Sequence, residues 1–218
     1  MKKKPTSFLG KLWYFIWHED SLASWIVNII IAFVLIKYIV YPGLGLIMGT
    51  QFPVVAVVSG SMHHGLENKG DFYEMCGNRF DEREFRSNFD DWWDYCGDWY
   101  KDNLNITSDE FKEFPLSNGF SRGDIIVLRG ANNLEIGDII VFEANREYPI
   151  IHRIIDITNE GEIKFTTKGD HNPGVGNIDQ NITKDRIYGK AYFKIPYLGY
   201  VKILFVDFLS LFGINVGG

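Results

Sequence analysis

The sequence has few cysteines and histidines and lacks a long basic segment. Only two of its 218 residues are cysteine and five are histidine, and no compact ligand spacing that includes a histidine occurs. The sequence therefore predicts no metal site. Because no basic patch with interleaved aromatic residues is present, we expect no nucleic-acid partner. An apolar content of 46% argues against disorder, and the length fits one folded domain with attachments.

The negative charge is concentrated in residues 67–113, which we call the insert. The chain has a net charge of −6, and the insert holds 14 of its 28 acidic residues but six of its 22 basic ones. The insert is rich in aromatic residues and contains both cysteines, Cys76 and Cys96. If it lies outside the cytoplasm, we expect a disulfide worth about 3 kcal/mol on the chain-entropy model, and two free thiols are the alternative.

Residues 22–40 form an apolar run of 19 residues with one charge, Lys37. At a rise of about 1.5 Å per residue, a helix of this length nearly crosses a hydrocarbon layer of about 30 Å. The run is longer than the core of a signal peptide, and no small-x-small cleavage site follows before Pro42. We therefore predict an uncleaved transmembrane anchor over residues 21–46, with a buried helix of a soluble core as the alternative.

Positive charges precede this run but do not follow it closely. Four lysines lie before it, whereas residues 41–67 contain no lysine or arginine. The positive-inside rule then places residues 1–20 in the cytoplasm and the remainder of the chain outside. An aromatic belt at the lipid interface is expected from Trp13, Tyr14, Trp17 and Trp25.

The C-terminal segment, residues 200–218, is also apolar, but it is short and contains Asp207. It fits a second, short membrane helix as well as a helix that lies on the membrane surface. The sequence leaves both alternatives open, so we expect a membrane protein with one or two passes.

After Pro53 the apolar runs become short and rich in β-branched residues. They are bounded by glycine, asparagine and proline and have no clear 3.6-residue period, which is typical of strands. The runs cover residues 54–58, 124–128, 138–142, 150–157, 163–167 and 187–195. We predict a mainly β domain, similar to a barrel, that is built from residues 50–66 and 114–199 and interrupted by the insert.

The first predicted strand leads into the segment Ser59-Gly60-Ser61-Met62. Two serines around a glycine fit an ordinary turn, but they also fit a nucleophile, Ser61, beside an oxyanion donor, Ser59. A serine hydroxyl is a poor nucleophile until a base takes its proton. The sequence must therefore also supply a base.

Five histidines are candidates for this base, and His152 fits best. His18 precedes the membrane run, His63 and His64 follow the serine too closely to turn back easily, and His171 lies in a loop. His152 lies in an apolar strand, where a partly desolvated imidazole suits general base catalysis near neutral pH. The alternative is a strand histidine with a packing role only.

A carboxylate that orients His152 must come from another segment. Asp156 shares its strand face, but four residues of strand span about 13 Å, which is too far for a hydrogen bond. The loop at residues 167–179, rich in glycine, asparagine and proline, offers Asp170 and Asp179. The alternative is an ordinary turn in which these side chains cap the backbone.

Together these segments resemble a known family. In chain order they are the anchor, SGSM, GDIIVF, IIHRII, TKGD and YGKAYFKIPYLGYV. This order is similar to that of type I signal peptidases, specifically the archaeal and endoplasmic-reticulum branch, which uses histidine where the bacterial branch uses lysine. The resemblance covers about residues 20–66 and 120–205, and it implies a signal-peptidase-like β catalytic domain with a membrane helix.

The resemblance also implies a role for five residues. Ser61 would be the nucleophile, His152 the base and Asp179 the acid that orients it, with Asp170 as a second, supporting carboxylate. The Ser59 hydroxyl and the Ser61 amide would stabilise the oxyanion. The sequence departs from the family pattern in two places, because His64 stands where proline is usual and nine positions separate the two aspartates.

The function implied is removal of signal peptides from secretory preproteins outside the cytoplasm, at the cell membrane or the endoplasmic-reticulum membrane. No cofactor is needed for this chemistry, and the expected partners are preproteins, membrane lipid and the protein translocation channel. Two alternatives remain open. One is a serine–lysine peptidase of the same fold, with Lys168 or Lys164 as base. The other is a membrane-tethered β module without activity, whose insert binds a partner or a glycan.

Overall fold

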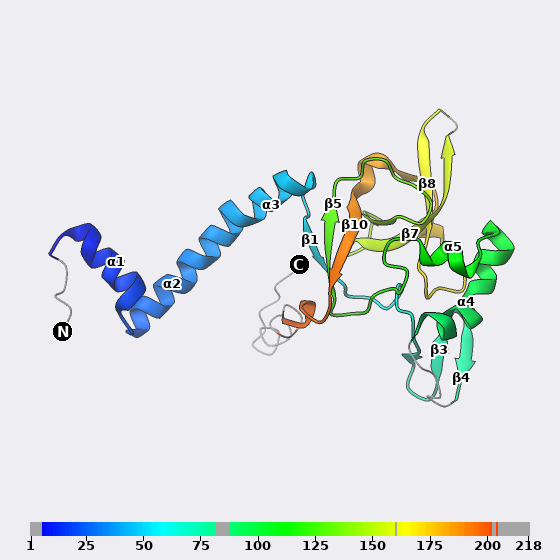
Figure 1. The fold of residues 1–218 in the computed structure, drawn as a ribbon, viewed down its shortest axis with the longest axis horizontal. Helices are drawn as coiled ribbons and strands as arrows, with labels where there is room; N and C mark the ends of the chain where they lie inside the picture. The colour runs from blue at the N-terminus through cyan, green and yellow to red at the C-terminus, as the bar shows by residue number, and fades with distance from the viewer. Residues whose placement is uncertain (1–5, 82–87, 160, 202–203, 205–218) are drawn as a thin grey trace. The chain divides into compact units, whose positions relative to one another are not determined.

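A computed structural model of the chain describes residues 6–81, 88–159, 161–201 and 204. The chain divides into two compact units, residues 1–47 and 48–218, which are considered separately (Figure 1). The predicted C-terminal membrane segment, residues 200–218, lies almost wholly outside the described residues.

The described residues of the N-terminal unit are mostly helical. It consists of α1 (Phe8–His18), α2 (Leu22–Leu35), the π-helical turn η1 (Ile36–Val40) and α3 (Tyr41–Met48). The helix α1 was not predicted. Two polar side chains of α2 tie it to α1: Ser24 Oγ donates to the Phe15 carbonyl at 2.6 Å, and Asn28 Nδ2 donates to the Ile16 carbonyl at 2.9 Å. These polar residues in an apolar run thus satisfy carbonyls at the C-terminal end of α1.

Residues Leu22–Met48 form one helical segment of 27 residues, and its most apolar window of 18 residues has a mean hydropathy of 2.2. It is long and apolar enough to cross a membrane, and only 6% of its most apolar window is buried, as expected for a surface that faces lipid. The π-helical turn ends two residues before Pro42. Since proline has no backbone N–H, the α-helical hydrogen-bond pattern must be interrupted near this position.

The second unit is built on a seven-stranded antiparallel sheet that curls, so the mainly β fold is confirmed. Its strands lie in the order β1-β5-β10-β6-β7-β8-β9, and Figure 1 shows β1, β5 and β10 side by side. All six predicted strands are present, with shifts of up to two residues at their ends, and β9 is additional. Their bounds are β1 Val54–Ala56, β5 Ile125–Arg129, β6 Ile139–Phe142, β7 Ile150–Asn159, β8 Ile163–Lys168, β9 Ile182–Thr183 and β10 Ile187–Ile195, with 3-10 turns at η2 Asn177–Asp179 and η3 Lys184–Arg186.

The central strands are buried on both faces because two apolar clusters pack against them. One cluster includes Val57, Met62 and Ile139, and the other includes Ile140 and Phe142. On β7, residues 151–155 are all buried, so any polar side chain there needs a partner. His152 and Arg153 are both in this position, and the candidate site forms around them.

The insert folds onto the sheet instead of forming a separate unit. It contains a small three-stranded sheet and two helices, and its aromatic core extends to Ile155 of β7. Cys76 and Cys96 form the predicted disulfide, which joins the small sheet to the first of these helices. The elements are β2 Glu67–Asn68, β3 Tyr73–Met75, β4 Asn78–Phe80, α4 Phe89–Leu104 and α5 Ser108–Lys112.

Candidate active site

Ser61 lies in a tight turn just after β1. The antiparallel pairing continues for one residue past the strand, because Val57 N donates to the Asp124 carbonyl at 2.9 Å and Val57 O accepts from Gly123 N at 2.9 Å. The turn then closes with a bond of 2.9 Å from His63 N to the Gly60 carbonyl. Met62 is 1% exposed and anchors the turn in the core, while Ser61 stays partly accessible.

His152 and Asp179 are joined by a hydrogen bond from the imidazole Nδ1 to the carboxylate Oδ1. Asp179 also accepts from Thr167 Oγ1 at 2.8 Å and from Gly176 N at 3.1 Å. Burial alone would raise the pKa of Asp179, but the hydrogen bonds from His152, Thr167 and Gly176 and the attraction to His152 outweigh it and lower the pKa. An ionised Asp179 keeps the proton of a neutral His152 on Nδ1, which leaves the Nε2 lone pair free.

This Nε2 atom lies close to the serine turn, and Gly169 allows the approach. A Cβ atom on Gly169 would lie 2.8 Å from His152 Nε2 and 2.8 Å from the Ser61 carbonyl oxygen. Both groups therefore line the same small space, which a side chain at position 169 would fill. Ser61 Oγ lies 3.3 Å from Ser59 Oγ, so the two hydroxyls lie side by side, and the backbone carbonyl of Ser61 lies near His152 Nε2.

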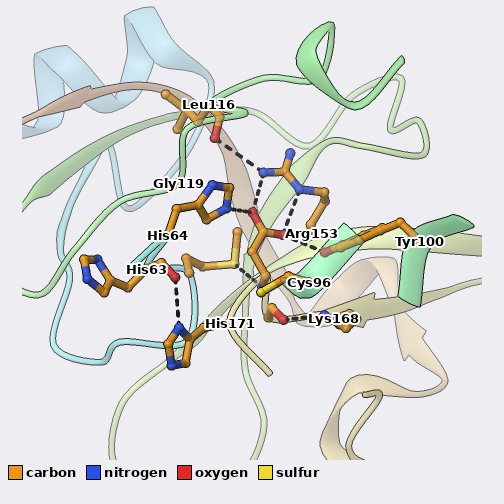
Figure 2. A network of polar contacts seen from close by, with 12 residues as sticks. His63, His64, Cys96, Tyr100, Leu116, Gly119, Arg153, Lys168 and His171 are labelled. Carbon is orange, nitrogen blue, oxygen red and sulfur yellow. Dashed lines mark hydrogen bonds and ion pairs between the residues drawn. The ribbon is translucent and has the colours of Figure 1, made fainter. Parts of the chain in front are cut away.

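Asp170 forms no hydrogen bond with His152. It forms a buried ion pair with Arg153, the residue that follows His152 in the chain. Arg153 Nε donates to Oδ1 at 3.0 Å and Nη2 donates to Oδ2 at 2.7 Å, and both side chains are fully buried (Figure 2). Burial opposes ionisation of Asp170, but the Arg153 charge and the His64 hydrogen bond hold its pKa well below the usual range. Asp179 is therefore placed to orient His152, and Asp170 is placed to organise the surrounding loops.

Two further donors complete the surroundings of Asp170. Tyr100, from α4, donates its hydroxyl to Oδ1 at 3.0 Å, and His64 Nε2 donates to Oδ2 at 2.9 Å. Burial lowers the pKa of His64 to about 4, so its ring is neutral near pH 7. The His64 ring stacks on Trp92, also from α4, with a centroid distance of 3.7 Å.

The two lysines considered as alternative bases lie in different surroundings. Lys168 is buried, donates to the Gly169 carbonyl at 3.1 Å, and lies over the rings of Trp99 and Tyr100 at 5.0 and 4.9 Å. Burial lowers its pKa to about 8. Lys164 lies four residues earlier on β8, about 13 Å along the strand. Within the described residues, neither lysine forms a hydrogen bond with Ser61, and neither does His152.

Sequence reasoning missed several residues of this site, namely His64, Tyr100, Arg153 and Thr167. A signal existed for Arg153, because a charged residue in an apolar strand must find a partner. No comparable signal existed for Tyr100 or Thr167, whose hydroxyls reach their carboxylates only through the tertiary fold.

Comparison with known proteins reveals relatives that are named catalytic subunits of the signal peptidase complex. The chain is 36% identical over 99 residues to the signal peptidase complex catalytic subunit SEC11C of Homo sapiens. It is 36% identical over 100 residues to the catalytic subunit SEC11 of Colletotrichum graminicola and 39% identical over 98 residues to that of Lachancea thermotolerans. The resemblance to the endoplasmic-reticulum and archaeal branch of type I signal peptidases is confirmed.

The similarity to these signal peptidase subunits is partial. It involves 38–41% of this chain and 52–58% of each of the three relatives, so the chain spans about half the length of the curated relatives it matches. No family model matches the chain. The individual roles of Ser61, His152, Asp179, Asp170 and Ser59 therefore stay predictions.

Proposed function

We propose that this protein is a membrane-bound serine endopeptidase that removes signal peptides from exported preproteins. One observation carries the proposal: His152 is bonded to Asp179 through Nδ1, while its Nε2 lies in the same small space as Ser61. In serine peptidases on unrelated folds, the base is joined to its orienting acid in the same way and the nucleophile lies beside the base. The likeness to SEC11 subunits supports the choice of signal peptides as substrate.

In the proposed reaction, His152 Nε2 takes the proton of Ser61 Oγ as this oxygen attacks the carbonyl carbon of the scissile peptide. The negative charge that develops on the carbonyl oxygen is stabilised by the Ser61 backbone amide and the Ser59 hydroxyl. The protonated imidazole then gives its proton to the leaving amine, and a Ser61 ester remains. Water, activated by His152, hydrolyses this ester and restores the enzyme.

The strand β1 offers a place for the substrate chain. It lies at the end of the strand order, paired with β5 alone, and leads directly to Ser61. An extended peptide that adds to this edge would gain main-chain hydrogen bonds, and alternate side chains would enter pockets. Pockets for small residues at two alternating positions would fit the small-x-small pattern before a signal-peptide cleavage point.

Replacing Ser61 with alanine is expected to lower kcat for cleavage of a preprotein by about 10⁴-fold or more, because the ester cannot form. Initial rates with a purified preprotein in detergent would measure this. Ser108→Ala is a matched control, since it removes a hydroxyl from α5 of the insert and should leave the rate unchanged. A folded Ser61→Ala protein with more than a tenth of the normal rate would contradict the proposal.

The proposed orientation places residues 1–20 in the cytoplasm and residues 48–199 outside, where the Cys76–Cys96 disulfide can persist. In sealed inside-out membrane vesicles, added protease should therefore leave residues 48–199 intact. Detergent should make the same region accessible to the protease. Digestion of this region in vesicles that stay sealed to a luminal control protein would contradict the orientation.

A further inference from the structure

The geometry points to the insert as a positioning element for Ser61, acting through Tyr100 and His64. This inference rests on the proposed function. It concerns residues 67–113, whose place in the reaction is otherwise unexplained, and in particular the helix α4. Tyr100 and His64 are positioning residues in this account, because neither is placed to touch the scissile bond.

The loop that carries Asp170 is joined to the serine turn at successive residues. His171 N donates to the Ser61 carbonyl at 2.9 Å, and Asp170 N lies 3.4 Å from the Met62 sulfur, a weak acceptor. His171 Nδ1 donates to the His63 carbonyl at 3.0 Å (Figure 2). The position of Ser61 is thus set by the position of the Asp170 loop.

The insert fixes that loop from the other side. Tyr100 donates to Asp170 Oδ1 at 3.0 Å, and Trp92 stacks on His64, which donates to Asp170 Oδ2 at 2.9 Å. Cys76 N also donates to the His171 carbonyl at 3.1 Å. Figure 2 shows Tyr100, His64 and Arg153 converging from different parts of the chain. Arg153 directly follows His152, so the same carboxylate connects the base, the serine turn and the insert.

A histidine at position 64 is not explained by packing alone. Its ring is buried, and its Nδ1 atom has no hydrogen-bond partner within the described residues. Leaving a buried polar atom unpaired costs free energy, which an apolar side chain of similar size would avoid. The bond from Nε2 to Asp170 gives this residue a use, since it holds the serine turn against the Asp170 loop. A displacement near 1 Å at the nucleophile can lower a rate by about 10²-fold.

The test compares four variants of the full chain in detergent, with kcat and KM measured separately on a preprotein. Tyr100→Phe and His64→Leu each remove one donor to Asp170 and are expected to lower kcat by about tenfold to hundredfold, with KM within about twofold. His64→Gln keeps a nitrogen donor at a similar reach and should retain most of the rate. Tyr73→Phe, on β3 of the same insert, removes a hydroxyl that is not bonded to Asp170 and should change neither constant.

A folded Tyr100→Phe protein with normal kcat would overturn the inference, as would a rise in KM with kcat unchanged. Should Tyr100→Phe fail to fold, the His64→Gln and His64→Leu pair decides, because equal rates for the two would also overturn it. Ser61→Ala, measured in parallel, separates failure of this inference from failure of the proposed function. If it is inactive while Tyr100→Phe is normal, the insert has no positioning role but the peptidase function stands. If it is active, the proposed function itself fails.

Discussion

His152→Gln is expected to fold and to lose cleavage activity by about 10⁴-fold or more in kcat. Glutamine has a similar size and polarity, but its amide cannot take a proton from Ser61. Initial rates with a preprotein would measure the loss, and circular dichroism would check the fold. His18→Ala, in α1 of the N-terminal unit, is the matched histidine control and should be fully active.

The result for His152 also separates the proposal from its alternatives. Near-normal activity in folded His152→Gln would contradict a histidine base. It would favour a lysine base, for which Lys168, with a pKa lowered to about 8 by burial, is the stronger candidate. In that case Lys168→Met would abolish cleavage while His152→Gln would not. Absence of preprotein cleavage by the unaltered protein would favour a tethered module that only binds.

Asp170→Ala is expected to destabilise the protein by about 3–5 kcal/mol, because it leaves the fully buried Arg153 charge without its partner. Tyr100 and His64 would lose their acceptor as well. Chemical denaturation of the full chain in detergent would measure the change in the free energy of unfolding.

An exposed ion pair in the insert provides the control for this measurement. Asp98 and Lys101 lie 3.0 Å apart with 72% and 48% of their side chains exposed. Asp98→Ala should therefore cost no more than about 1 kcal/mol. Equal effects of Asp170→Ala and Asp98→Ala would show that the buried ion pair does not hold the site together.

Local patterns in the sequence were sufficient for most of the sheet and for the long apolar helix. The six strands followed from β-branched runs bounded by turn residues, and the candidate span followed from the length of one apolar run. The helix α1 was missed because its aromatic residues were interpreted as an interfacial belt. The helices of the insert were not predicted, although their capping residues, Asn88 and Thr107, are typical of helix N-termini.

The candidate site was predictable in its parts but not in its connections. Ser61 and His152 could be chosen because each had a local context that suits its proposed chemistry. The residues alone leave the partner of His152 open, because Asp170 and Asp179 lie in one loop, and only the family resemblance implies Asp179. Their contacts are separated by the tertiary fold. His64 lies too close to Ser61 along the chain to be expected as its base, and its side chain is hydrogen-bonded to Asp170 instead. Contacts of this kind depend on residues far apart in sequence.

The most direct test is a double-mutant cycle on Ser61 and His152, with kcat/KM measured for Ser61→Ala, His152→Gln and the double variant. If the two residues act as one catalytic unit, the double variant should be no less active than the weaker single variant, since either change already removes the whole couple. If the losses multiply, or if either folded single variant keeps near-normal activity, the hydroxyl and the imidazole do not share a proton and the proposed mechanism is wrong.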